Sequence, residues 1–92
     1  MGYTWLPGRF AILVGVEPYE VMQVLDGPGR RLPRRTIGPH GLPLVGILGR
    51  TAAGRDLVVY VRHDTGLDWT IVGARPMTAA ESADYDKWEA QQ

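Results

Sequence analysis

Residues 56–63 read Asp-Leu-Val-Val-Tyr-Val-Arg-His and are the most strand-like stretch of the chain. Their β-branched and aromatic side chains favour the pleated backbone of a sheet. Successive side chains of a strand point to opposite faces, so Val58, Tyr60 and Arg62 share one face and the alternating aliphatic residues share the other. We therefore predict a buried strand here, with the rest of the sheet built on either side of it.

Turn-forming residues on both sides of this strand predict an antiparallel meander. Residues 51–54, Thr-Ala-Ala-Gly, are typical of a hairpin loop, and residues 64–67 of a second turn. Pro33 lacks the N–H that a central strand needs, so its segment belongs at a sheet edge. The further strands are expected at residues 42–50, at residues 68–75 and, along the edge, at residues 30–37. The prediction is a small antiparallel sheet of three to four strands.

Helices are predicted before and after the meander. Residues 17–25 form a two-turn helix, because Pro18 suits the first helical position and an apolar stripe follows at helical spacing. A C-terminal helix begins after Thr78, since Thr-Ala-Ala-Glu is a capping box with Glu81 at its third helical position. The apolar run at residues 10–16 fits a short strand or a helix equally well. We expect an α+β fold with an N-terminal helical segment and a C-terminal helix.

Composition narrows the classes of function. The 92 residues include two histidines and no cysteine, which excludes a disulfide scaffold and thiolate metal sites. We expect no metal and no cofactor. No apolar run approaches the roughly 20 residues of a membrane-spanning helix, and we expect no signal peptide. The expectation is a single cytoplasmic domain, residues 1–92, without a membrane partner.

The formal net charge of zero hides an uneven distribution of charge. Residues 29–75 carry eight arginines against three aspartates, a net charge of +5, whereas the two flanking segments are acidic. The planar guanidinium of arginine suits phosphate, nucleobases and carboxylates, although solvated charges that merely balance one another explain the pattern equally well. The densest cluster indicates a nucleic acid or an acidic protein as partner, and comprises Arg30, Arg31, Arg34 and Arg35.

Arginines on the predicted strands are the strongest candidates for chemistry. If the strand registers bring Arg50, Arg62 and Arg75 together, they form a basic cleft with Tyr60 or Tyr85 nearby. Such a cleft can stabilise the phosphorane that forms when an RNA 2′-hydroxyl attacks the adjacent phosphate. This reaction requires no metal ion, because the nucleophile belongs to the substrate and side chains move the protons.

Each candidate also has a purely structural interpretation. Arg62 and Arg75 can pair with neighbouring carboxylates, and Tyr85 and Trp88 have the spacing of core residues on a helix. His63, at a strand end, is a candidate general acid.

Two familiar catalytic motifs are excluded. Residues 49–56 have the glycine spacing of a P-loop, but Arg55 and Asp56 replace its Lys and Ser/Thr, and a strand follows instead of a helix. Ser82, the only serine, lies in no G-x-S-x-G turn. Nucleotide binding by a P-loop and catalysis by a serine nucleophile are therefore not expected.

Four motifs in the same order resemble those of BrnT-like proteins. Residues 3–7, Tyr-Thr-Trp-Leu-Pro, are similar to the family's aromatic-x-Trp-x-Pro opening, and residues 15–25 resemble its Gly-Val and following helix. Residues 49–59 resemble its hairpin, and residues 71–85 its ending, in which Ala-Arg is followed by Thr-x-x-Glu-x-x-x-Tyr. The similarity spans nearly the whole chain.

This resemblance implies the toxin of a type II toxin–antitoxin pair, with a RelE-like ribonuclease fold, RNA as substrate and a cognate antitoxin as partner. A homodimer or a hetero-oligomer with the antitoxin is expected. Leu13 and Val14 stand where the family carries a Lys-His pair, which keeps open a non-catalytic interaction module that binds a protein or nucleic acid. The candidate catalytic residues are Arg50, Arg62, Arg75, His63, Glu81 and Tyr85. The candidate RNA-binding residues are Arg30, Arg31, Arg34, Arg35 and Arg55.

Overall fold

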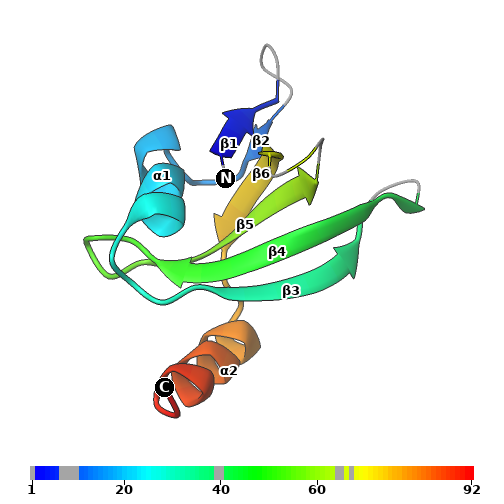
Figure 1. Cartoon of the computed structure of the whole chain (residues 1–92). Helices are drawn as coiled ribbons and strands as arrows, with labels where there is room; N and C mark the ends of the chain where they lie inside the picture. Colours follow the sequence, from blue (N-terminus) through cyan, green and yellow to red (C-terminus); the bar gives the residue numbers. More distant parts are fainter. Residues whose placement is uncertain (1, 7–10, 39–40, 64–65, 67) are drawn as a thin grey trace.

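The strand predicted from residues 56–63 is β5 (Asp56–His63), and it lies in the middle of the sheet (Figure 1). The structure is a computed structural model that describes residues 2–6, 11–38, 41–63, 66 and 68–92. β5 pairs antiparallel with β4 (Pro43–Arg50) and with β6 (Asp68–Pro76), and β3 (Leu32–Ile37) pairs antiparallel with β4 at one edge. The antiparallel meander is thus confirmed; most of the turn predicted at residues 64–67 lies outside the described residues.

The sheet has more strands than the sequence predicts. β1 (Gly2–Trp5) and β2 (Ile12–Leu13) lie one after the other along β6, both parallel to it, which makes the sheet six-stranded and mixed. The prediction of three to four antiparallel strands is therefore wrong. Parallel pairing joins segments that are far apart in the sequence, so no local turn motif predicts it. The N-terminal helical segment is also corrected, since two strands precede the first helix.

This first helix, α1 (Pro18–Asp26), covers one face of the sheet. Val21, Val24 and Leu25 are buried there against aliphatic side chains of β4, β5 and β6. Gly49 permits the close approach, because a Cβ atom at that position would lie 2.8 Å from a Val24 methyl carbon. The predicted apolar stripe thereby positions the helix.

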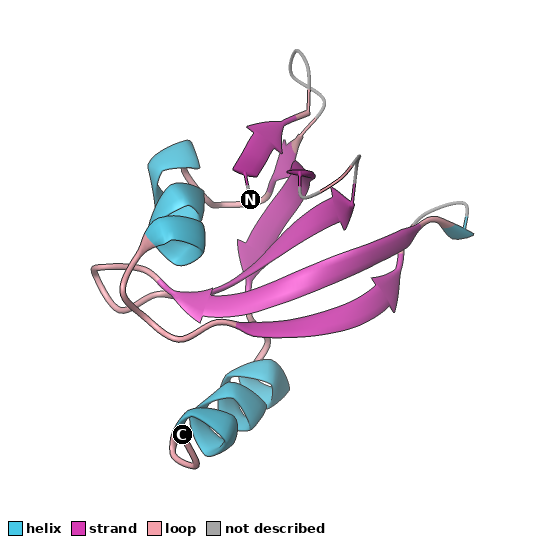
Figure 2. Ribbon diagram, viewed as in Figure 1, coloured by secondary structure: helices cyan, strands magenta, loops and turns pink. Residues whose placement is uncertain are grey.

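The C-terminal helix, α2 (Ala79–Glu89), packs against the other face (Figure 2). The predicted capping box is confirmed: the Thr78 hydroxyl accepts the Glu81 N–H at 3.2 Å, and the Glu81 carboxylate accepts the Thr78 N–H at 2.8 Å. Tyr85 packs on Leu48 and Val58, with further packing from partly buried neighbours. This cluster holds α2 over the end of the face where these two aliphatic residues lie.

Two helices and a mixed sheet confirm the α+β class. Within the described residues, neither helix is long and apolar enough to cross a membrane, since α2 has 11 residues and a bilayer requires roughly 20.

Candidate functional site

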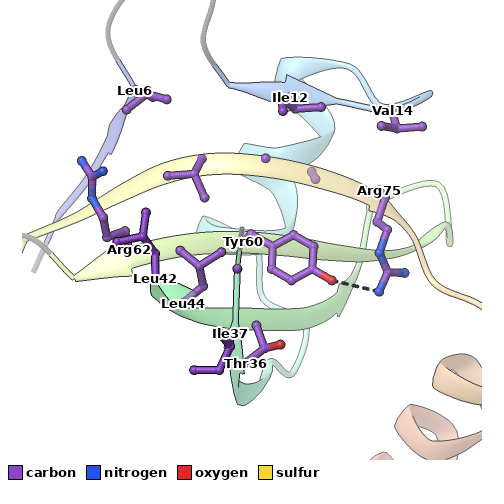
Figure 3. Close-up of a pocket in the computed structure, with 14 residues that line it drawn as sticks. Leu6, Ile12, Val14, Thr36, Ile37, Leu42, Leu44, Tyr60, Arg62 and Arg75 are labelled. Carbon is purple, nitrogen blue, oxygen red and sulfur yellow. Dashed lines mark hydrogen bonds between the residues drawn. The ribbon is translucent and has the colours of Figure 1, made fainter. Parts of the chain in front are cut away.

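The part of the sheet face beyond α2 forms an open groove of about 510 Å³. Ile12 and Val14 lie on one side of it, and Ile37, Leu42 and Leu44 lie on the other (Figure 3). Between these sides lie three polar side chains, Tyr60, Arg62 and Arg75. We call this space the groove. It combines predicted arginines with aliphatic side chains that the sequence did not single out as a site.

Tyr60, Arg75 and Glu81 are joined by hydrogen bonds. Arg75 donates to both oxygens of the Glu81 carboxylate, at 2.6 and 2.8 Å, and to the Tyr60 hydroxyl at 2.9 Å. The Arg75 hydrogen bonds hold the pKa of Glu81 at about 2, so its carboxylate is ionised at neutral pH. The same contacts raise the pKa of Arg75 above its ordinary value. The three residues form a charged and ordered group at one end of the groove.

The ring of Tyr60 rests on a glycine. A Cβ atom at Gly46 would lie 3.3 Å from a Tyr60 ring carbon and from a Val58 methyl carbon. Only a residue without a side chain therefore leaves the ring where it lies, with the Arg75 guanidinium carbon 5.6 Å from the ring centre.

Arg62 occupies the opposite end of the groove from Arg75 (Figure 3). Arg75 lies beside Val58 in the sheet register, four residues before Arg62 on β5. At about 3.3 Å per residue, the two arginine backbones are roughly 13 Å apart along the strand, with Tyr60 between them. The backbone of Arg62 pairs with β6, but its side chain forms no ion pair or hydrogen bond with the described residues. Its charge is therefore open to a ligand.

Arg50 does not join the other two arginines, which corrects the expected three-arginine cleft. Its guanidinium donates to Asp56 at 2.7 Å, to Asp86 at 2.7 Å and to Glu89 at 3.1 Å. It also lies 5.0 Å from the centre of the Tyr85 ring. The hydrogen bonds that Arg50 donates to these carboxylates raise its pKa above the ordinary value. The contacts assign Arg50 to the attachment of α2 to the sheet.

Two further catalytic candidates lie away from the groove. Tyr85 is fully buried, its hydroxyl donates to the Arg30 carbonyl at 2.7 Å, and burial raises its pKa. His63 belongs to the α1 face of the sheet, where its ring contacts Trp69 edge-on and its Nε2 donates to the Gly66 carbonyl at 2.7 Å. Neither side chain is part of the described groove lining, although Tyr60 packs against the cluster that contains Tyr85.

The predicted RNA-binding arginines have several structural contacts. Arg55 donates to both oxygens of Glu20, at 2.7 and 2.8 Å, and to the Gly15 carbonyl at 3.1 Å. Glu20 also accepts the backbone N–H of Glu17, which lowers its pKa. Arg55 therefore ties the β4–β5 loop to the start of α1.

Of the four arginines on and before β3, two contact other parts of the protein and two form no ion pair with the described residues. Arg31 donates to the Leu25 carbonyl at the end of α1, and Arg34 lies 3.5 Å from Asp84 on α2. In the described chain, the exposed side chains of Arg30 and Arg35 form no ion pair. This cluster is not continuous with the groove, whose described lining contains none of its four members.

The aliphatic sides of the groove carry a signal that sequence reasoning missed. Leu13 and Val14 belong to the apolar run at residues 10–16 and stand where a Lys-His pair is expected. In the fold Leu13 packs on the core, whereas Val14 is exposed at the groove beside Arg75 (Figure 3). A single sequence does not show that β2 lies close to the β3–β4 end of the sheet.

Among the described residues, no group of three His, Asp or Glu side chains is arranged to hold a metal ion. No family model, no curated protein and no solved structure matches this chain.

Proposed function

We propose that this protein is an endoribonuclease of the BrnT-like, RelE-like kind, the toxin of a toxin–antitoxin pair, and that it cuts RNA without a metal ion. The observation that supports this function is the placement of Arg62 and Arg75 on either side of Tyr60 on an open sheet face. Arg62 and Arg75 follow one another along the strand direction of the sheet, so they can contact two phosphates of a single RNA strand. The aromatic ring of Tyr60 between them can stack on a base.

Charge stabilisation is the main chemical contribution of the proposed site. In the reaction, the RNA 2′-oxygen forms a bond to the adjacent phosphorus and the bond to the 5′-oxygen breaks, leaving a 2′,3′-cyclic phosphate. The phosphorane between these states carries extra negative charge, which the guanidinium of Arg75 is placed to neutralise. Arg62 holds a phosphate further along the strand and so fixes its position.

Two protons must move in this reaction, and the site has a group for each. The ionised carboxylate of Glu81 accepts the proton of the 2′-hydroxyl once the phosphate draws Arg75 toward itself, because loss of that partner raises the basicity of Glu81. The Tyr60 hydroxyl donates a proton to the departing 5′-oxygen and regains one from water. No other co-reactant is needed.

Cleavage of RNA by the purified chain tests the proposal. We expect cleavage in the presence of EDTA, with products that end in a 2′,3′-cyclic phosphate, and growth arrest when the chain is expressed. Arg62→Gln and Tyr60→Phe should each reduce the cleavage rate by roughly 100-fold. Intact RNA together with normal growth of the expressing cells would rule the ribonuclease out.

Lys87→Gln is the matched control for loss of one positive charge. Lys87 is exposed on α2 and does not line the groove, so cleavage should be unchanged. Equal losses from Lys87→Gln and Arg62→Gln would attribute the effect to net charge rather than to the site. Thermal melts of all variants separate lost chemistry from lost folding.

A non-catalytic interaction module is the second candidate, and the lining of the groove favours it. Leu13 and Val14 replace a polar pair of the family that the sequence resembles, and Val14 presents a methyl surface beside Arg75. Under this alternative the chain binds a partner without cutting RNA. Growth arrest without RNA cleavage, unchanged in Tyr60→Phe, would favour it over the ribonuclease.

A further inference from the structure

Exposed hydrophobic side chains gather at the groove instead of being scattered. Of the five large hydrophobic side chains that stand out as exposed in the described chain, four line it: Ile12, Val14, Ile37 and Leu42. Ile12 and Ile37 are 70% and 69% exposed. Single exposed aliphatic residues are ordinary on a protein surface, but a contiguous set marks a surface that another molecule covers.

The charge at the groove indicates which charge the covering molecule carries. Its described lining contains two arginines and no carboxylate. Glu81 already neutralises Arg75 from the rim, whereas Arg62 has no ion pair in the described part of the chain. A complementary surface therefore places apolar side chains between the two sides of the groove and a carboxylate at the Arg62 end.

The chain's own α2 shows which kind of segment this sheet face accepts. α2 lies on the same face, packs Tyr85 on Leu48 and Val58, and gives carboxylates to arginines of three strands. It is thus an acidic helix that contacts the sheet mainly through the buried ring of Tyr85. The groove is the part of that face which α2 leaves uncovered, and a sheet face of this kind is normally covered by a second layer.

The width of the groove is suitable for a helix. Its sides lie on β2 and on the β3–β4 end, which are separated by up to four strand spacings. At about 4.8 Å per spacing this is roughly 19 Å, enough for an α-helix of about 10–12 Å diameter with its side chains.

We propose that the groove binds an acidic amphipathic helix of a partner protein, which rests its apolar side on Ile12, Ile37 and Leu42 and pairs a carboxylate with Arg62. This binding surface goes beyond the proposed ribonuclease. Because Tyr60 lies in the groove, a bound helix also covers the proposed RNA site; only that consequence rests on the proposed function.

A pair of designed peptides tests the proposal on the full chain. The probe is a fluorescent 16-residue helical peptide with Leu at positions i, i+4 and i+7 and Glu beside them. The control peptide has the same sequence with Lys in place of each Glu. Fluorescence anisotropy should show binding of the acidic peptide at least about tenfold tighter than that of the basic one. Arg62→Glu should reverse this preference.

Exposed groove side chains provide variants that do not disturb the core. Ile37→Ser and Leu42→Ser should each weaken binding by about tenfold, since each removes an apolar anchor. Tyr19→Ser is the matched control, because Tyr19 is 63% exposed on α1 and lies outside the groove. Its affinity should equal that of the wild-type chain.

Three results would overturn the proposal. The first is absence of peptide binding by a chain whose thermal melt is normal, and the second is equal affinity for both peptides. The third is self-association in sedimentation that disappears in Ile37→Ser, which would assign the groove to a second copy of the chain. Peptide binding is measured without RNA, so failure of the ribonuclease leaves this test unaffected.

Discussion

Arg50→Met should destabilise the protein by detaching α2 from the sheet. The substitution removes hydrogen-bonded ion pairs to Asp56, Asp86 and Glu89 and a cation–π contact with Tyr85. Methionine retains the apolar stem of arginine, so the loss is confined to the guanidinium. Arg50→Met therefore tests whether Arg50 attaches α2 to the sheet, as its contacts indicate, or takes part in catalysis, as the sequence predicts.

The size of the effect follows from the exposure of the contacts. The Arg50 side chain is 32% exposed and that of Asp86 is 63% exposed, so each ion pair contributes about 0.2–1 kcal/mol. The ring contact adds about 0.5–1 kcal/mol. Together with the repulsion left among three carboxylates, we expect a loss of about 2–3 kcal/mol. In a domain of this size each kcal/mol lowers Tm by about 4–8 °C, so Tm should fall by roughly 10–20 °C.

Thermal melts followed by circular dichroism measure this difference. Arg30→Met is the matched control, since the exposed Arg30 side chain forms no ion pair in the described chain, and its Tm should match the wild type. About 1 M salt should narrow the gap caused by Arg50→Met, because salt screens exposed ion pairs. A Tm within about 2 °C of the wild type, combined with lost RNA cleavage, would return Arg50 to the catalytic site.

Three other substitutions test the fold around the site. Glu81→Gln should lower the free energy of unfolding at pH 7, as measured by urea melts. The folded pKa of Glu81, about 2, lies below the ordinary 4.5, so the difference in free energy between wild type and variant is present above pH 4.5 and should vanish as the pH falls toward 2. Gly49→Ala should cost about 1–3 kcal/mol in urea melts, because its Cβ would crowd α1, whereas Gly29→Ala, whose nearest neighbour is 3.9 Å away, should be tolerated. Thr78→Ala should cost about 1 kcal/mol and reduce the helical signal of α2 in circular dichroism.

Local signals predicted much of the fold. The alternation in residues 56–63, the hairpin loop after β4 and the capping box at Thr78 each operate within a few residues, and each element forms where expected. β1 was not predicted, and the apolar run that contains β2 was left open between a strand and a helix, since the residues of β6 that pair with them lie more than 60 positions away in the chain. A four-residue and a two-residue strand also carry too little alternation to be recognised.

The candidate site was predicted less completely than the fold. Alternation correctly placed Tyr60 and Arg62 on one face, and the register adds Arg75 to it. Arg50 has the same residue type and lies on the same face, but carboxylates of α2 surround it, and a single sequence contains no record of where that helix packs. The apolar character of the groove was missed for the same reason, because its two sides come from distant segments.

The parallel pairing of β1 with β6 determines the order in which the fold can form during synthesis. The β3–β6 meander can assemble hairpin by hairpin as it leaves the ribosome, whereas β1 emerges first and must wait for β6, which emerges last among the strands. Until then β1 has no partner strand, and its unpaired backbone groups can pair with another chain. Removal of β1 would leave β6 without a neighbour on that side from Asp68 to Ile71, so we expect the truncated chain to aggregate more readily.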